Sequence, residues 1–225
     1  MEKSNTIYLK TVVGCFIIFF FFEMIAGLGI TYLNISILMA TGFARICDIV
    51  GIIGLLFYSG TSLSSIGILK NKFWQGIQLG IIWSCGFGAI CLIIAIGLFF
   101  WGINPFSLIH STMLDSWIIF ISYLLVGCVI GPIGEEFIFR GIVYSYFRQW
   151  GTITAIGLST AIFIMFHSLS AGLPITQIIG GILFAMAFEQ SKLLVTPIII
   201  HIIGNTCIFL LSISTHFFKV ALTLN

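Results

Sequence analysis

The sequence predicts an all-α fold, a polytopic transmembrane helix bundle of about seven to eight spans. Of the 225 residues, 60% are hydrophobic and 7% are charged, whereas about a quarter are charged in ordinary soluble domains. The mean hydropathy is +1.21. Long uncharged segments separate the charged residues, and a helix needs roughly 20 mostly apolar residues to cross the hydrocarbon core. These three observations exclude a soluble globular domain and a disordered chain.

The first spans are separated by short loops. The first one continues past Glu23 to about Ile30, which is too long for the apolar core of a signal peptide, so we expect it to be retained. A second span that begins as early as Ile35 would include Arg45 and Asp48. The first three spans are expected at 11–31, 46–59 and 76–100.

The second half of the chain holds four further apolar segments. The first of these is long enough to be broken, and residues 103–116 before it could form a short interfacial helix. No repeat or linker divides the chain, so we expect a single integral membrane domain over 1–225, with a motif-bearing core at about 115–213. These four spans are expected at 117–148, 152–168, 175–190 and 193–213.

Basic residues favour one side of the membrane. If the amino terminus is inside, six Lys and Arg residues lie at cytoplasmic ends, whereas only Arg45 and Lys219 lie outside. This asymmetry satisfies the positive-inside rule, so a cytoplasmic amino terminus is expected. The Ile and Phe bias, typical of AT-rich codons, favours a bacterial cell membrane. The six basic residues expected at cytoplasmic ends are Lys3, Lys10, Lys70, Lys72, Arg148 and Lys192.

Charge and cysteine content argue against two classes of binding protein. Nine basic and seven acidic residues leave a formal net charge of +2, so no nucleic-acid partner is expected, because phosphates require a basic surface. The six cysteines form no CxxC pair, unlike those of disulfide frameworks or zinc knuckles. We expect them to act as small apolar residues.

Three clusters of polar residues lie in the apolar body, where a charged or polar group is costly to bury. An ionisable group inside a membrane is a functional hypothesis by default. The clusters are Glu135, Glu136 and Arg140 within GPIGEEFIFRG, then His167 within FIMFH, then His201 and Asn205 within HIIGN.

The spacing predicts how the first two clusters face each other. Glu136 and Arg140 are one helical turn apart and share a face, while Glu135 points about 100° away. The turn between the two spans is expected near 149–152. Counted from this turn, Glu135 and His167 both lie about 22–24 Å along their helices. An antiparallel helix pair would therefore place them at one level of the membrane.

The third cluster lies in the last span. His201 and Asn205 are four residues apart and share a helical face, and Gly204 lets another group approach. The three clusters together are typical of a hydrolytic site, because they combine two carboxylates, an arginine, two histidines and an asparagine. In such a site a carboxylate takes a proton from water, and donors hold the developing oxyanion.

Each cluster alone also has a structural interpretation. Glu136 and Arg140 could form an internal ion pair that holds two helices together. Either histidine could be hydrogen-bonded to a backbone carbonyl, and Asn205 could link two helices. Glu23 and Glu189 are expected to be solvated or paired charges at span ends. The joint occurrence of the three clusters is what favours catalysis.

The ordered motifs EExxxR, FxxxH and HxxxN resemble the defining set of the CPBP family of intramembrane proteases. This family includes CAAX prenyl endopeptidases and Abi-like bacterial proteins of bacteriocin processing and self-immunity. The motifs cover 135–205, about a third of the chain, and the first 115 residues carry none of them. The resemblance implies that Glu135 activates the attacking water with the help of His167. It also implies that Glu136 and Arg140 organise the motif helix.

The same resemblance implies that His201 and Asn205 stabilise the oxyanion. The family has been described both as metalloproteases and as glutamic proteases. Glu135, His167 and His201 could bind zinc at an open site, but a metal-free Glu and His could also act on water. The metal-free alternative is favoured, because Asn and Arg complete an oxyanion and ion-pair network better than a metal shell. No cofactor is therefore expected, and zinc remains the alternative.

The sequence thus leads to the hypothesis of an intramembrane endopeptidase. It would hydrolyse peptide bonds of membrane-associated peptides or proteins, such as a CAAX-type protein or a leader, signalling or bacteriocin precursor, at or within the lipid bilayer. The alternative is a protein without enzymatic activity. It would be either a bacteriocin self-immunity protein or a transporter that uses the buried carboxylates as a proton or cation relay.

Overall fold

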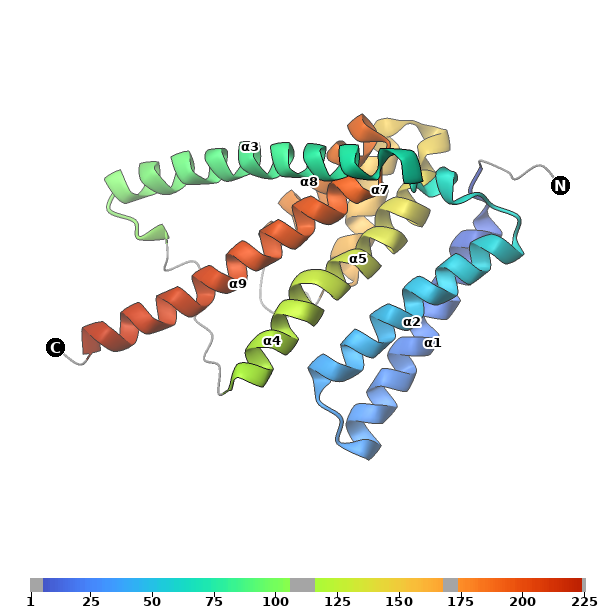
Figure 1. The fold of residues 1–225 in the computed structure, drawn as a ribbon. Helices are drawn as coiled ribbons and strands as arrows, with labels where there is room; N and C mark the ends of the chain where they lie inside the picture. Colours follow the sequence, from blue (N-terminus) through green and yellow to red (C-terminus); the bar gives the residue numbers. More distant parts are fainter. Residues whose placement is uncertain (1–5, 106–115, 168–173, 224–225) are drawn as a thin grey trace.

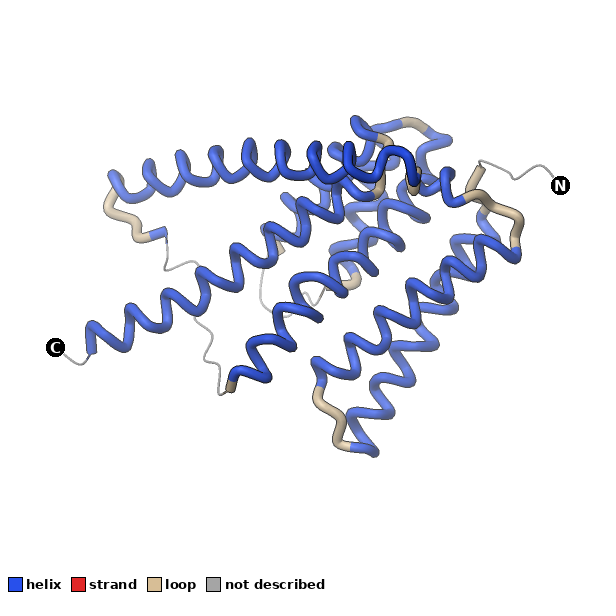
Figure 2. Tube along the Cα trace, viewed as in Figure 1, coloured by secondary structure: helices blue, strands red, loops and turns tan. Residues whose placement is uncertain are grey.

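Long helices make up the structure, a computed structural model that describes residues 6–105, 116–167 and 174–223, with side chains described up to 215. Figure 2 shows helices joined by short loops and no strand in these residues. The helices of the first half are α1 (Leu9–Leu33), α2 (Ile37–Tyr58) and α3 (Phe73–Phe100), with two short 3₁₀ turns, η1 (Leu63–Ile66) and η2 (Lys70–Lys72).

The second half contains one compound helix and three simple ones. The compound helix, Trp117–Trp150, carries the EExxxR motif, and we call it the motif helix. Its parts are α4 (Trp117–Leu125), η4 (Val126–Ile130), α5 (Gly131–Glu136), η5 (Phe137–Tyr144), α6 (Ser145–Phe147) and η6 (Arg148–Trp150). The simple helices are α7 (Thr152–Met165), α8 (Ile175–Ser191) and α9 (Val195–Thr223).

The predicted helical bundle is confirmed. Among the described residues, five helical segments are long and apolar enough to cross a membrane, namely α1, α2, Leu63–Phe100, the motif helix and Val195–Thr215 of α9. Helix α7 has only 14 residues, a rise of about 21 Å. It ends two residues before His167 and is therefore shorter than the roughly 30 Å of a hydrocarbon core. The expected interfacial helix falls mostly on 106–115, outside the described residues, and seven to eight spans stays a prediction.

The structure supports the early one of the two starts considered for the second span. Helix α2 begins at Ile37, close to Ile35 and nine residues before 46, after Ser36 caps it by accepting a hydrogen bond from the backbone N–H of Met39. Arg45 and Asp48 consequently lie inside the helix. Their charges do not end it, because Arg45 binds Asp48 at 2.7 Å and is neutralised within the bundle.

The motif helix occupies the centre of the bundle. It runs between the α1–α2 pair and helix α9 (Figure 1), and it packs against both. Every residue of η5 is buried. Helix α7 pairs with α8, and α3 pairs with α9. The segment that bears Arg140 is thus enclosed by the other helices.

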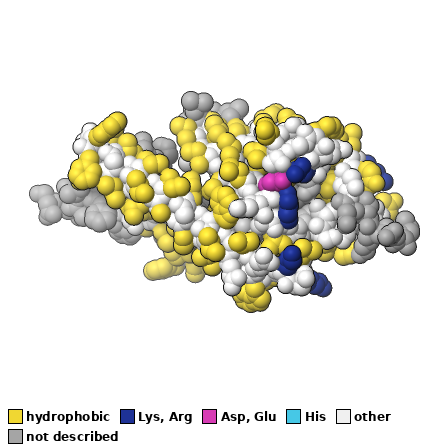
Figure 3. Space-filling view, turned by 90° about the horizontal axis from the view of Figure 1, so that it is seen from above, with side chains coloured by type: hydrophobic (Ala, Val, Ile, Leu, Met, Phe, Trp, Pro, Cys, Tyr) yellow, Lys and Arg dark blue, Asp and Glu magenta, His cyan; other side chains and the backbone are white. Residues whose placement is uncertain are grey.

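Basic residues gather at one end of the bundle. Because successive helices alternate in direction, Lys10, Lys70, Lys72, Arg148 and Lys192 all lie at or near the helix ends on this side. Figure 3 views the molecule from above and shows Lys and Arg side chains on this face. Lys3 and the side chain of Lys219 lie outside the described residues.

Glu189 is a paired end charge, as predicted. It accepts hydrogen bonds from the hydroxyl of Tyr144 at 2.7 Å and from Nε of Arg148 at 2.9 Å. It also binds Nζ of Lys192 at 2.6 Å. These contacts tie the end of α8 to the end of the motif helix.

Glycines let α3 approach α9 closely. A Cβ placed on Gly80 would lie 2.6 Å from Cβ of Ile199 and 3.0 Å from the carbonyl oxygen of Thr196. Both distances are too short for a side chain. Small residues at such interfaces allow two membrane helices to pack backbone against backbone.

Gly80→Ala is expected to destabilise the protein by about 1–3 kcal/mol, because the added methyl forces α3 away from α9. The thermal midpoint of purified protein in detergent micelles measures this loss. Gly86→Ala on the same helix is the matched control, since a Cβ at Gly86 meets nothing within 4 Å. Equal midpoints for the two variants would contradict the close α3–α9 contact.

Candidate active site

The structure brings five of the six predicted site residues together. They come from four elements: Glu135 and Glu136 from α5, Arg140 from η5, His167 from the end of α7 and His201 from α9. Contacts of 2.8 to 3.8 Å connect them. These distances support the prediction that the three clusters converge.

Glu136 is the centre of the buried part of the site. Its Oε1 accepts a hydrogen bond from Nη1 of Arg140 at 2.9 Å and contacts Nδ1 of His201 at 2.8 Å. The side chains of Glu136 and Arg140 are fully buried, and that of His201 is 7% exposed. The predicted ion pair therefore exists, and it also fixes the orientation of one of the two histidines.

Two aromatic rings hold Arg140 in place. Its guanidinium carbon lies 4.7 Å from the ring centre of Phe163 and 5.1 Å from that of Phe184. These distances are within the range of cation–π attraction. Nη2 donates to the carbonyl oxygen of Gly181 at 3.2 Å, and the ring of His201 stacks on Phe184 at 4.5 Å. Helices α7 and α8 thus fix the ion pair from both sides.

Phe184 and Gly181 were not among the site residues predicted from the sequence. Neither belongs to a motif, and α8 is apolar almost throughout, so no pattern in it marked a contact. The signal that was present is the pair Gly180 and Gly181 in the middle of a helix, where glycine is unfavourable without a packing reason. A Cβ on Gly181 would lie 2.7 Å from Cγ2 of Thr160 on α7.

Glu135 faces two imidazole rings on the accessible side of the site. Its Oε2 lies 3.7 Å from Nε2 of His167 and 3.8 Å from Nε2 of His201. Glu135 and His167 therefore do lie at one level, as predicted. Their side chains are 21% and 28% exposed, whereas Glu136 is fully buried. The two adjacent carboxylates thus differ in access, one reachable from outside and one enclosed.

The hydrogen bonds indicate where the ring protons lie. Nδ1 of His167 is 2.8 Å from the carbonyl oxygen of Phe163, which can only accept. Nδ1 of His201 faces the carboxylate of Glu136, which also accepts when ionised. We therefore assign a proton to each Nδ1, so that a neutral ring presents its Nε2 as an acceptor. For His167 this acceptor faces a second one, Oε2 of Glu135, at 3.7 Å, and a site between two acceptors suits a donor such as water.

Asn205 contacts the motif helix rather than Glu135. Its Nδ2 donates to the carbonyl oxygen of Gly127 at 3.1 Å. This carbonyl lies in the π-helical η4, where N–H groups bond five residues back, as Gly131 does to Val126. The corresponding donor for Gly127 would be Pro132, which has no N–H. Asn205 therefore supplies the missing donor and links α9 to the motif helix.

Glu135, His167 and His201 are the residues that would bind zinc in the alternative mechanism, and they lie slightly further apart than the donors around a bound zinc ion. Donors bound at 2.0–2.1 Å around a tetrahedral zinc lie about 3.4 Å from one another, whereas Oε2 of Glu135 is 3.7 Å from His167 and 3.8 Å from His201. In the part of the chain that the structure describes, no three His, Cys, Asp or Glu side chains are arranged to hold a metal ion. The metal-free site expected from the sequence stays a prediction.

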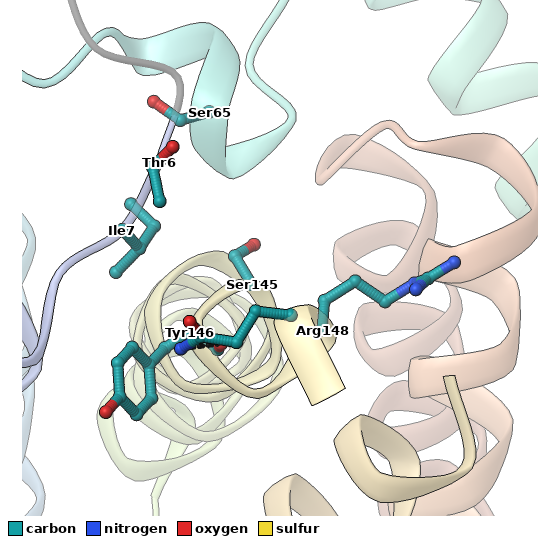
Figure 4. Close-up of a pocket in the computed structure, with 7 residues that line it drawn as sticks. Thr6, Ile7, Ser65, Ser145, Tyr146 and Arg148 are labelled. Carbon is teal, nitrogen blue, oxygen red and sulfur yellow. Dashed lines mark hydrogen bonds between the residues drawn. The ribbon is translucent and has the colours of Figure 1, made fainter. Parts of the chain in front are cut away.

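A pocket of about 240 Å³ lies at the carboxy-terminal end of the motif helix (Figure 4). It is lined by Thr6 and Ile7 of the amino-terminal segment and by Ser145, Tyr146 and Arg148, among others. None of the six motif residues lines this pocket. It is therefore separate from the site around Glu135.

The comparisons with known proteins point to one family. Residues 115–207 match the family described as type II CAAX prenyl endopeptidase Rce1-like. All six predicted site residues lie inside this segment. Neither a curated protein nor a solved structure matches the chain significantly. The resemblance inferred from the three motifs is confirmed: residues 115–207 of this helical integral membrane protein are similar to the CAAX prenyl endopeptidase family.

Proposed function

We propose that this protein is an intramembrane endopeptidase that hydrolyses a peptide bond of a membrane-associated peptide or protein through water activated by Glu135. The observation that carries the proposal is the accessible carboxylate of Glu135 facing Nε2 of both His167 and His201. The family description adds the substrate class, a prenylated protein with a CAAX carboxyl terminus.

Water is the nucleophile in this mechanism. A water molecule beside Glu135 donates one hydrogen bond to Oε2 and the other to Nε2 of His167, so that a lone pair on its oxygen faces the substrate carbonyl. On attack, one O–H bond breaks, a C–O bond forms and Glu135 takes the proton. The C–N bond then breaks, and Glu135 delivers this proton to the leaving amine. No step requires a metal or a redox partner.

The oxyanion of the tetrahedral intermediate is stabilised from α9. His201 can donate from Nε2 while its Nδ1 donates to Glu136 only when both ring nitrogens carry protons. Asn205 lies one turn further along the helix. The bond to the backbone uses one of its two amide hydrogens, and the other serves the oxyanion.

The basic end of the bundle supports a cytoplasmic orientation for that end, and for the amino terminus with it. Lys70 and Lys72 lie there together with Arg148 and Lys192, and cytoplasmic ends of membrane proteins are enriched in such residues. A bacterial cell membrane remains part of the proposal, as the Ile and Phe bias favours.

Purified protein reconstituted in liposomes tests the proposed function. The probe is a farnesylated peptide that ends in a CAAX sequence, incubated in H₂¹⁸O, with the same peptide lacking the farnesyl group beside it. We expect one new carboxyl terminus that carries one ¹⁸O atom, formed from the farnesylated peptide. Cleavage of both peptides at equal rates would move the substrate class to unprenylated precursors, and cleavage of neither would contradict the proposed substrate chemistry.

Asn205→Ala is expected to lower kcat by about 10²–10³-fold with little change in KM, because one oxyanion donor is removed. Peptide cleavage by variant protein, corrected for the folded fraction, measures this effect. Ser214→Ala is the matched control on the same helix, since this hydroxyl bonds only within α9 in the structure. A lowered thermal midpoint with unchanged kcat would instead make Asn205 a purely structural link to Gly127.

A further inference from the structure

A second charged cluster lies within the first two helices, outside the segment that matches the family. Nη2 of Arg45 binds Oε1 of Glu23 at 2.7 Å, and Nη1 binds Oδ2 of Asp48 at 2.7 Å. The Asp48 side chain is fully buried, and that of Arg45 is 13% exposed. Charges at this depth are costly and are seldom present without a role. Stability alone does not explain them, because apolar residues of similar volume often serve as well.

Arg45 contacts the backbone of the motif helix next to Glu135. Helix α2 packs against α5, and a Cβ on Gly134 would lie 3.0 Å from Cδ of Arg45 and 3.5 Å from its Cβ. A methyl group at this position would therefore require the Arg45 side chain to move by a few tenths of an ångström. Gly134 directly precedes Glu135, so the place of the arginine stem fixes the backbone from which the catalytic carboxylate extends.

The same arginine reaches the other accessible group through two aromatic rings. Its guanidinium carbon lies 4.8 Å from the ring centre of Phe19. Phe19 in turn contacts Phe166 edge to face, with ring centres 5.0 Å apart. Phe166 directly precedes His167. The charged cluster thus contacts the segment before Glu135 directly and the segment before His167 through one intervening ring.

We propose that Arg45, held by Glu23 and Asp48, is a positioning residue that sets the separation between Glu135 and His167. This inference rests on the proposed function and adds a part of the chain that lies outside residues 115–207. Two carboxylates, one on each terminal nitrogen, fix the orientation of the guanidinium group. The aliphatic part of the Arg45 side chain then sets the distance between α2 and α5. The separation of 3.7 Å matters because a displacement of about 1 Å can lower the rate by about 10²-fold.

The first test removes every charge of the cluster at nearly constant volume, in the triple variant Glu23→Gln, Arg45→Met, Asp48→Asn. No unpaired charge remains, so the fold is expected to persist. We expect kcat for the farnesylated peptide to fall by about 10- to 100-fold, with KM within about threefold of the original, because the site is misaligned while the binding surface is intact. Arg45→Lys, which keeps the charge and most of the stem, is expected to restore part of kcat relative to the triple variant.

The second test changes the contact itself. Gly134→Ala places a methyl against the stem of Arg45 and is expected to lower kcat to a similar degree. Gly157→Ala is the matched control, since a Cβ there meets nothing within 4 Å, and its kcat is expected to stay unchanged. If the triple variant does not fold, the kcat values of Arg45→Lys, Gly134→Ala and the control Gly157→Ala are sufficient to test the positioning role.

The outcomes separate this inference from the proposed function. If the unaltered protein cleaves and the folded triple variant, Arg45→Lys and Gly134→Ala all keep the original kcat, the positioning role is wrong and the protease assignment stands. If the apparent kcat falls only in proportion to the folded fraction while KM is unchanged, the cluster is structural and the inference is also overturned. If the unaltered protein cleaves nothing, the proposed function fails, and this inference fails with it.

Discussion

Glu135→Gln is expected to lower kcat by about 10³-fold or more, near the upper part of the range for the loss of a general base. The amide keeps the size of the side chain but cannot take a proton from water. The fold is expected to survive, because Glu135 is partly exposed and its histidine neighbours lie at 3.7 and 3.8 Å, beyond hydrogen-bond distance. Steady-state cleavage of the farnesylated peptide in liposomes measures the loss.

Glu189→Gln is the matched control for this change. It makes the same chemical substitution at the end of α8, where the carboxylate binds Tyr144, Arg148 and Lys192. Its kcat per folded molecule is expected to stay within about twofold of the original, since surface ion pairs contribute little. Full activity in folded Glu135→Gln protein would show that another group activates the water.

Arg140→Met is expected to have the largest effect on folding, a loss of about 3–5 kcal/mol. The substitution leaves the fully buried carboxylate of Glu136 without its ion-pair partner, and it removes the cation held between Phe163 and Phe184. An uncompensated charge in this position costs more than the original pair contributed. Unfolding in increasing denaturant, followed in mixed micelles, measures the difference.

The double variant Glu136→Gln, Arg140→Met separates charge from packing. It removes both charges, so we expect it to recover much of the stability lost in Arg140→Met, as replacement of whole buried pairs often does. Its kcat is nevertheless expected to stay low, because His201 loses the carboxylate that fixes its ring. A single Arg140→Met variant as stable as the original protein would contradict the buried ion pair.

The motif geometry could be predicted from the sequence because it depends on helix repeats. Four-residue spacing placed Glu136 and Arg140 on one face, and counting from the turn placed Glu135 and His167 at one level. Both expectations match the distances of 2.9 Å and 3.7 Å. The same reasoning gave the helical class and most helix positions, since apolar segments of about 20 residues have few other structures available in a membrane.

Contacts between distant segments could not be predicted in this way. The sequence left two starts open for the second span, because one of the two carboxylates that bind Arg45, that of Glu23, lies on another helix. The bond between Glu136 and His201 joins residues 65 positions apart, and no spacing rule indicates it. The link from Asn205 to Gly127 follows from the missing N–H of Pro132, which becomes informative only once η4 is known to be π-helical.

The most direct test of the central claim compares the peptides in membranes and culture medium of cells that carry either the original chain or Glu135→Gln, with protein levels matched. Mass spectrometry of these peptides assumes no substrate. We predict at least one cleavage product that is present with the original chain and absent with the variant, and its new terminus would identify the scissile bond. Identical peptides in both cell lines would contradict a protease that depends on Glu135 and would favour the alternative without enzymatic activity.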